Sequence, residues 1–329
     1  MNQSHLHLND FTQKAGRKQI PKYYGNCLVE LGRKDLSIVA LSGDLAPATE
    51  CDEFKKEFPT RYFSAGIAEA NMIGLAAGMA RSGDKPFVHS FSVFLSRRAY
   101  DQIAMQIAYP KLNVKLAGFL PGLTTNLGVS HQAIDDIALM RALPNITIVE
   151  PGFNLQIEQL VMASADFNGP VYMRLHRPIS LDESFPYPSD FEFGRGQLLI
   201  DGDDAIVFAS GHSVKEAIVA SRACAEKGIS VAVANIHTIK PLDKLFVLEQ
   251  AKHKKVAVTA ENHSIIGGLG ASIAEVFAES QQAFNNGLKF KRIGINDKFA
   301  EGGSTEFLFA KYGLSSIHIE NTIINLIEN

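Results

Sequence analysis

This 329-residue chain has few cysteines, no large excess of either charge and no long apolar run. Its three cysteines, Cys27, Cys51 and Cys224, lie far apart and lack the paired spacing of a zinc or redox site, so we expect them to be reduced and without a chemical role. The 32 Lys and Arg residues against 35 Asp and Glu leave a net charge of -3. That balance argues against a protein that binds nucleic acid by neutralising its phosphates.

Targeting and membrane segments are also missing. No window approaches the roughly 18 to 20 uninterrupted apolar residues of a membrane span. The first residues, MNQSHLHLND, lack the charged start and apolar stretch of a signal peptide. We therefore expect a cytoplasmic protein that does not enter a membrane. Its apolar fraction of 46% is typical of a globular chain, and its length favours two domains over one.

Short apolar, β-branched runs alternate with helix-like segments along the chain. In the first half the expected strands are 36–42, 87–91, 113–119, 145–151 and 170–175, and the expected helices are 69–81, 94–108 and 153–167. In the second half the expected strands are 205–210, 229–236, 255–261 and 290–295, with helices that start near Gly211, Pro241 and Gly268. This alternation predicts an α/β fold with two doubly wound, mainly parallel-sheet domains. The proline-containing segment 177–196 favours a connector, so we place the domains at 1–185 and 186–329.

Two motifs put candidate side chains next to expected strands and helices. SGDLAP begins at Ser42, at the carboxyl edge of the first expected strand, where doubly wound sheets build sites, although a structural turn before a helix explains it as well. GIAEANM places Glu69 at the start of a helix of small residues, where the helix dipole stabilises an anion. A solvated carboxylate at a helix start is the simpler reading of that segment alone.

Aromatic side chains and a histidine follow. PFVHSFSVF contains Phe87, Phe91 and Phe94 around a strand end, where they either pack in the core or form a slot for a planar ring. A long loop then leads to His131 in SHQAIDD, which is either a substrate contact and proton carrier or a capping residue. ENHSIIGGLG (261–270) lacks the spacing of a phosphate loop, so close helix packing or a subunit contact is favoured there.

In this order the motifs resemble the C-terminal half of transketolase, which comprises the pyrimidine-binding and C-terminal domains of that thiamine diphosphate enzyme. The resemblance spans nearly the whole chain, is carried by SGDLAP, GIAEANM, PFVHSFSVF and SHQAIDDIALMRALPN, and is supported by KPLD and ENHSIIGGLG. The family's GDG motif for diphosphate and magnesium is absent from the sequence. The resemblance therefore implies a split enzyme in which an N-terminal subunit holds the diphosphate and Mg²⁺, with an α2β2 assembly.

The resemblance also implies roles for the candidate residues in the transfer of a two-carbon ketol unit from a ketose, expected to be phosphorylated, to an aldehyde. The carboxyl group of Glu69 pairs with ring nitrogen N1′ of the cofactor's aminopyrimidine. In a cleft without water, a carboxyl group can exchange a proton with such a ring nitrogen. Phe91 and Phe94 pack on that ring, and Phe87 is left in the core. His131, a second catalytic candidate, contacts oxygen atoms of the donor.

Substrate binding is implied for Ser42 and Arg174, which fall near positions that grip the sugar phosphate, and Arg17 is a further candidate. Two departures from the family concern the sugar: Leu127 replaces an aspartate, and Phe119 replaces a phosphate-contacting histidine. Loss of a polar side chain that hydrogen-bonds to a substrate hydroxyl strongly alters substrate selectivity. We therefore do not expect the ordinary pentose phosphates as substrates.

Three alternatives remain open. The β subunit of a 2-oxoacid dehydrogenase E1 component has nearly this length, the same two domains and a partner that carries the diphosphate site. A 1-deoxyxylulose-5-phosphate synthase has a sequence motif similar to FLSRRAYDQ (94–102), but that enzyme is normally one long chain. A non-catalytic regulatory or scaffolding subunit is the third, and the retained Glu69 and aromatic pair argue against it.

Overall fold

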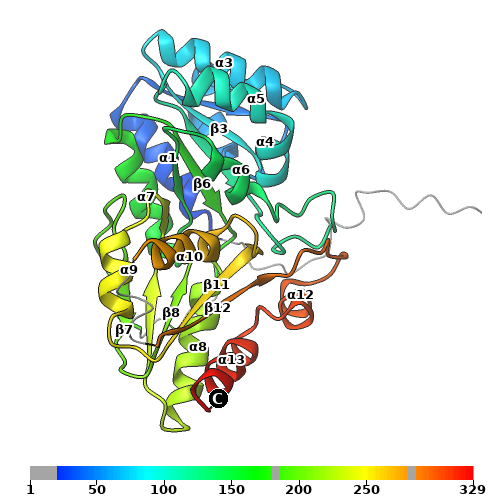
Figure 1. Ribbon diagram of the computed structural model, residues 1–329. Coiled ribbons are helices and arrows are strands. Elements are labelled where there is room, and N and C mark those ends of the chain that lie inside the picture. Colours follow the sequence, from blue (N-terminus) through cyan, green and yellow to red (C-terminus); the bar gives the residue numbers. More distant parts are fainter. Residues whose placement is uncertain (1–20, 180–181, 183–184, 281–286, 329) are drawn as a thin grey trace, which may run out of the picture.

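The computed structural model describes residues 21–179, 182, 185–280 and 287–328. In Figure 1 a first sheet and its helices lie above a second sheet with its own helices. Arg17 lies outside the described residues, so nothing further follows for that candidate.

The first sheet has the strand order β10-β5-β6-β4-β3-β1-β2. Its strands from the first half of the chain are β1 (Ile38–Ser42), β2 (Tyr62–Ser64), β3 (Lys85–Phe91), β4 (Lys115–Phe119), β5 (Thr147–Val149) and β6 (Val171–Leu175). These strands pair with one another in parallel. Parallel neighbours need crossover connections, and these run over both faces of the sheet.

Helices cover the two faces of this sheet. They are α1 (Tyr23–Lys34), α2 (Asp52–Glu57), the short η2 (Pro59–Arg61), α3 (Glu69–Arg81), α4 (Ser92–Arg98), α5 (Tyr100–Gln102), η3 (Ile103–Ala108), α6 (Asp136–Ala142) and α7 (Asn154–Asp166). Strand β1 shows the division, because Ile38 and Ala40 pack in the core with α1 and α7, whereas Val39 and Leu41 pack in the core with α3 and α6. Successive strand residues point to opposite faces, so both faces are buried.

The second sheet has the order β12-β11-β8-β9-β7 and is parallel except for the β7–β9 pair. Its strands are β7 (Gln197–Ile200), β8 (Ala205–Ala209), β9 (Val231–Asn235), β11 (Val256–Ser264) and β12 (Lys289–Ile295). Its helices are α8 (Ser213–Ala225), α9 (Lys244–Ala251), α10 (Leu269–Glu279), α12 (Thr305–Tyr312) and α13 (Ser316–Glu328). Apolar cores again lie on both faces, so the predicted α/β class with two mainly parallel sheets is confirmed.

One strand crosses the predicted division of the chain. β10 (Thr238–Lys240) comes from the second half, yet it pairs antiparallel with β5 at the edge of the first sheet. The Lys240 ammonium group also donates to the carbonyl oxygens of Arg141, at 2.9 Å, and Leu143. The boundary at 185/186 therefore stays a proposal, and β10 ties the two halves together across it.

The predicted strands and helices correspond to elements of the structure, but the sequence interpretation omits α1, α2, α12 and α13 and does not foresee a break within one helix. The helix expected over 69–81 has those bounds in the structure. The helix expected over 94–108 is broken instead, because Ala99 leaves helical geometry at φ -122° and ψ 19° and a π-helical turn follows over Ile103–Ala108. β7 and β10 were not expected; each is a short strand that pairs antiparallel at the edge of a sheet.

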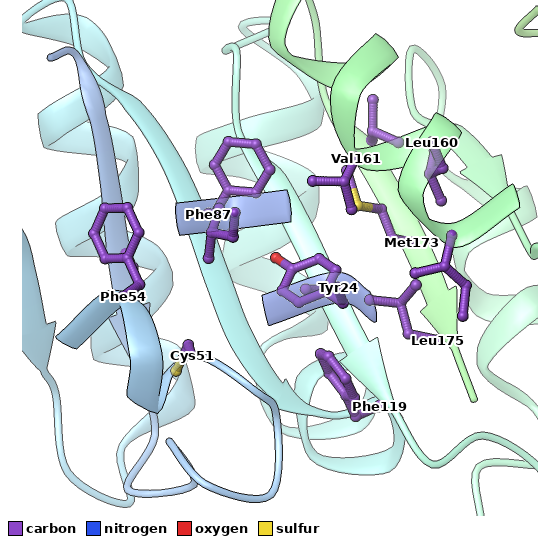
Figure 2. Packing of buried hydrophobic residues seen from close by; sticks show 14 of the residues in the cluster. Tyr24, Cys51, Phe54, Phe87, Phe119, Leu160, Val161, Met173 and Leu175 are labelled. Carbon is purple, nitrogen blue, oxygen red and sulfur yellow. The ribbon is translucent and has the colours of Figure 1, made fainter. Parts of the chain in front are cut away.

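The buried side chain of His89 connects helix α1 to the first sheet. Figure 2 shows Tyr24 among Phe87, Phe119 and Leu175 in that core. The Tyr24 hydroxyl lies 2.8 Å from Nε2 of His89, and Nδ1 of His89 lies 2.9 Å from the carbonyl oxygen of Leu41. The carbonyl can only accept, so Nδ1 carries the proton and the neutral ring accepts from Tyr24. Burial lowers the pKa of His89 from 6.5 to about 4.

Replacement of His89 by Gln should weaken the acid sensitivity of the fold. A histidine whose pKa is lowered by folding takes up a proton in the unfolded chain first, so its stabilising contribution is complete above pH 6.5 and is lost as the pH falls toward about 4. Between about pH 7 and about pH 5, the free energy of unfolding should fall by roughly 2 kcal/mol more in the wild-type chain than in His89→Gln. Urea unfolding at the two pH values measures this difference; equal losses would contradict it.

Candidate half-site at the edge of the first sheet

The candidate site begins where β2 passes into α3. Gly66 has φ +68°, a left-handed conformation that glycine adopts without strain, and the chain then enters the helix after Ala68. Glu69 is the first residue of α3, and only 4% of it is exposed. With so little exposed surface, Glu69 is not a freely solvated carboxylate, and that alternative is wrong.

Aromatic rings lie at the neighbouring strand end. Phe91 ends β3, and Phe94 lies in the first turn of α4, with ring centroids 5.8 Å apart. The loop after β4 brings His131 against both rings, at 6.1 Å from Phe91 and 5.2 Å from Phe94. Three candidates from separate parts of the sequence thus meet in one aromatic cluster.

Arg98 connects this cluster to Glu69. Its Nη1 donates to Oε1 of Glu69 at 2.9 Å, and its guanidinium carbon lies 3.9 Å from the centroid of the Phe94 ring. The sequence interpretation missed Arg98, although its spacing of one helical turn from Phe94 was a usable signal. The structure therefore connects Glu69 through Arg98 to the cluster of Phe91, Phe94 and His131. We call these five residues the half-site.

The charge of Arg98 also reaches His131. Partial burial and then the positive charge of Arg98 lower the pKa of His131 below 6.5. The neutral ring is therefore favoured, and Oγ of Ser130 lies 2.9 Å from its Nδ1. A neutral imidazole can donate from one nitrogen and accept at the other, which suits contact with hydroxyl or carbonyl oxygens.

Arg174 does not lie in this site, and the expectation that it grips a substrate phosphate needs correction. Its side chain has no exposed surface and forms ion pairs with Asp136, at 2.9 Å, and Glu150, at 2.5 Å. It also donates to the carbonyl oxygens of Ala133 and Asn262. A guanidinium that is buried and donates from all three nitrogens has no open face for a substrate.

The buried Arg174 network joins the two halves of the chain. Asn262 on β11 donates to Pro121 and accepts from the backbone of Leu123 at 2.9 Å. Gly122 has φ +57°, and a Cβ there would lie 2.2 Å from the carbonyl oxygen of Asn262. Although burial opposes ionisation, the charge of Arg174 holds the pKa of Asp136 below its ordinary value.

Ser42 is also closed to solvent. Its side chain is fully buried at the end of β1, and its Oγ accepts a hydrogen bond from the backbone N–H of Leu45 at 3.1 Å. This contact is the structural turn that the sequence left open. A substrate role for Ser42 would require this turn to open.

A different arginine faces a cavity. Arg177, three residues after Arg174, is exposed and lines a cavity of about 480 Å³ together with Thr124, His176, His212 and Lys215. Arg177 is thus a better candidate than Arg174 for holding an anion. The two arginines lie three residues apart, and only burial distinguishes them.

The two departures from the family pattern have different environments. Phe119 is buried, and its ring centroid lies 5.2 Å from that of Tyr24, so it is part of the core. Leu127 is 56% exposed on the loop that carries His131. Only Leu127 is therefore free to contact a bound molecule.

The start of α10 is already occupied by a carboxylate of the same chain. Oε2 and Oε1 of Glu261 accept from the backbone N–H groups of Leu269 and Gly270 at 2.7 and 2.9 Å. This geometry agrees with close helix packing at GGLG rather than phosphate binding. Burial raises the pKa of Glu261 to about 7, with Glu150 contributing in the same direction.

The described part of the chain contains no cluster of His, Cys, Asp and Glu able to hold a metal ion. Within the same residues, no helix has both the length and the hydropathy of a membrane span. What the site does offer is a buried carboxylate beside two aromatic rings and a histidine. That combination fits a planar nitrogen heterocycle, which hydrogen-bonds to the carboxylate and stacks on an aromatic face.

Comparison with known proteins assigns both halves of the chain. Residues 17–180 match the family model described as transketolase, pyrimidine binding domain, and residues 194–319 match transketolase, C-terminal domain. The chain is 40% identical to the 6-deoxy-6-sulfo-D-fructose transketolase subunit SqwH of Clostridium sp. (strain MSTE9), covering 90% of each chain. It is 33% identical to an apulose-4-phosphate transketolase subunit of Phocaeicola vulgatus, covering 93% of this chain and 97% of that one.

A solved structure agrees with these matches. The structure described as "Split gene transketolase, inactive beta4 tetramer" superposes with a TM-score of 0.83 at 38% identity, covering 93% of this chain and 97% of that chain.

Replacement of Arg174 by Met should destabilise the fold by about 3–5 kcal/mol, because it leaves two carboxylates buried without their cation. Arg33→Met is the matched control, since Arg33 pairs with Glu57 on the surface and its loss should change stability little. Chemical denaturation measures both. A loss as small for Arg174→Met as for Arg33→Met would contradict the assignment of Arg174 to the buried network.

Proposed function

This chain belongs to the transketolase family, and on that premise we propose that it is the C-terminal subunit of a split, thiamine diphosphate-dependent transketolase. It transfers a two-carbon ketol unit from a phosphorylated ketose to an aldehyde acceptor. The observation that carries the proposal is the buried carboxylate of Glu69 beside the Phe91, Phe94 and His131 rings. The proposal is supported by two relatives whose names describe them as transketolase subunits, because this chain matches nearly their whole length.

The side chains of the half-site fit the pyrimidine part of the cofactor. Glu69 would hold a proton between its carboxyl group and ring nitrogen N1′, and Phe91 and Phe94 would orient the ring by packing on it. His131 would donate to or accept from the donor's oxygen atoms. Bound thiamine diphosphate would supply the nucleophilic carbon and the electron sink for the two-carbon fragment.

An N-terminal partner subunit would hold the diphosphate and Mg²⁺. The absence of a GDG motif from the sequence supports this division. We propose an α2β2 assembly in which each cofactor lies between this chain and a partner. The exposed apolar side chains of Ile67, Leu75, Met105 and Tyr109, on or near α3 and η3, are the candidate contact surface.

The donor is proposed to differ from the ordinary pentose phosphates. Leu127 presents an exposed apolar side chain on the His131 loop, which removes a carboxylate partner for a substrate hydroxyl. Two relatives are named for unlike sugars, 6-deoxy-6-sulfo-D-fructose and apulose 4-phosphate, so the sugar varies among such subunits. Arg177 replaces Arg174 as the candidate for the anionic end of the donor.

Calorimetry with thiamine diphosphate and Mg²⁺ tests the cofactor assignment. We expect tight binding to this chain co-expressed with the adjacent transketolase-like gene product, and weak binding to this chain alone, because each chain holds one part of the site. No binding in either preparation would refute the assignment and leave a non-catalytic subunit. Release of carbon dioxide from pyruvate by the pair, without ketol transfer, would instead favour a dehydrogenase or synthase.

Substitution of Glu69 by Gln should reduce kcat of the reconstituted pair by about 100-fold or more, since a positioned proton-transfer group typically contributes that much. Glu30→Gln, which alters an exposed carboxylate on α1, should leave kcat unchanged. Full activity of the Glu69→Gln pair would show that the carboxyl group has no catalytic role.

Leu75→Arg should separate assembled chains without unfolding them. Leu75 is 43% exposed on α3, so a charged side chain there enters water in the free chain but an apolar contact in the assembly. Sedimentation of the chain should shift toward the monomer, while Leu245→Arg, an exposed leucine on α9, should not shift it. An unchanged assembly for Leu75→Arg would exclude this face from the interface.

A further inference from the structure

Arg98 links Glu69 to Phe94 in the half-site through two contacts. Its hydrogen bond to Glu69 and its contact with the Phe94 ring are both short, at 2.9 Å and 3.9 Å. Its side chain is nevertheless 46% exposed, against 4% for that of Glu69. Among the described residues, Glu69 alone accepts a hydrogen bond from this guanidinium. The group is therefore free to turn toward solvent at the cost of two contacts.

These two contacts match those that a protonated aminopyrimidine would make. Both groups are planar cations with an N–H donor in the plane, which points at a carboxylate, and a flat face, which lies on an aromatic ring. Resting on the function proposed above, we propose that Arg98 is a built-in placeholder for the cofactor's pyrimidine ring. It pairs with Glu69 and covers Phe94 in the free chain, and it turns away when the ring binds.

The placeholder has a physical purpose in a half-site. A buried carboxylate without a partner is costly, so an isolated chain needs a cation beside Glu69 until the cofactor arrives. The partner's contacts to the diphosphate then supply the free energy that displaces Arg98. A half-exposed ion pair and a cation–π contact are weak, so their displacement should reduce the affinity for the ring by about three- to tenfold.

The test uses the full chain and 4-amino-2-methylpyrimidine at millimolar concentration, with binding followed by NMR titration. Arg98→Met keeps an apolar stem over Phe94 but removes the charge, and it should bind this probe about three- to tenfold more tightly than the wild-type chain. Arg98→Lys, a cation without the planar face, should fall between them. Circular dichroism checks that each variant is folded.

Two controls isolate the contact with Glu69. Arg97→Met removes the same charge from the same helix, but Arg97 pairs with Asp135, so Glu69 remains covered and the affinity should not rise. In the double variant Glu69→Gln/Arg98→Met the gain should disappear, because the carboxylate that the probe would inherit is gone.

Equal or weaker probe binding by Arg98→Met, or no binding by either chain, overturns the placeholder. This outcome is separate from failure of the proposed function. Tight thiamine diphosphate binding by the co-expressed pair, without a gain from Arg98→Met, rejects the placeholder alone. No cofactor binding by the pair rejects the proposed function as well.

Discussion

The fully buried guanidinium of Arg174 is the interaction on which the arrangement of the two halves depends. It forms ion pairs with Asp136 of α6 and Glu150 after β5, and it donates to the backbone of β11 in the second sheet. Oε2 of Glu150 also accepts from Ser210 of the second half at 2.6 Å. Removing one partner would leave a buried charge or donor unpaired, so these segments are held in one relative position.

The same junction positions the candidate site through two consecutive aspartates. Asp136 is held by Arg174. Asp135 forms a bidentate ion pair with Arg97 of α4, with nitrogen–oxygen distances between 2.8 and 3.1 Å. The loop that carries His131 ends at these residues, while α4 carries Phe94. The His131 loop is also braced from the second half, because Gln132 donates to the carbonyl oxygen of Glu301. The second half thus contributes to the site by supporting its loop.

As proposed, the site would bind the ring of the cofactor but not the whole cofactor. Glu69, two phenylalanines and His131 are the proposed proton partner, stacking faces and oxygen contact, and all four come from the half of the chain that forms most of the first sheet. The neighbouring Arg98 supplies the charge that a buried carboxylate needs. Such a half-site is consistent with a chain that works against a partner surface, because the remaining contacts must come from outside it.

Hydrophobic periodicity predicted most of the strands and helices of the two sheets, because this pattern is set by residues close together in the sequence. The expected strands 36–42 and 170–175 correspond to β1 and β6, and the helix over 69–81 to α3. The resemblance carried by the motifs implied that Glu69, Phe91, Phe94 and His131 share one site, and in the structure these residues lie close together.

By itself, then, the sequence determined the class of fold, the order of its elements and the candidates for the ring-binding half-site. Only the tertiary structure decided that Arg174 is a buried link while Arg177 is exposed, and that Arg98 lies on Phe94 and Glu69. The reason is physical: every residue of β6 is buried on both sides of the sheet, so strand alternation carries no information about Arg174. Likewise, the contact between Arg98 and Glu69 joins two helices that only packing brings together.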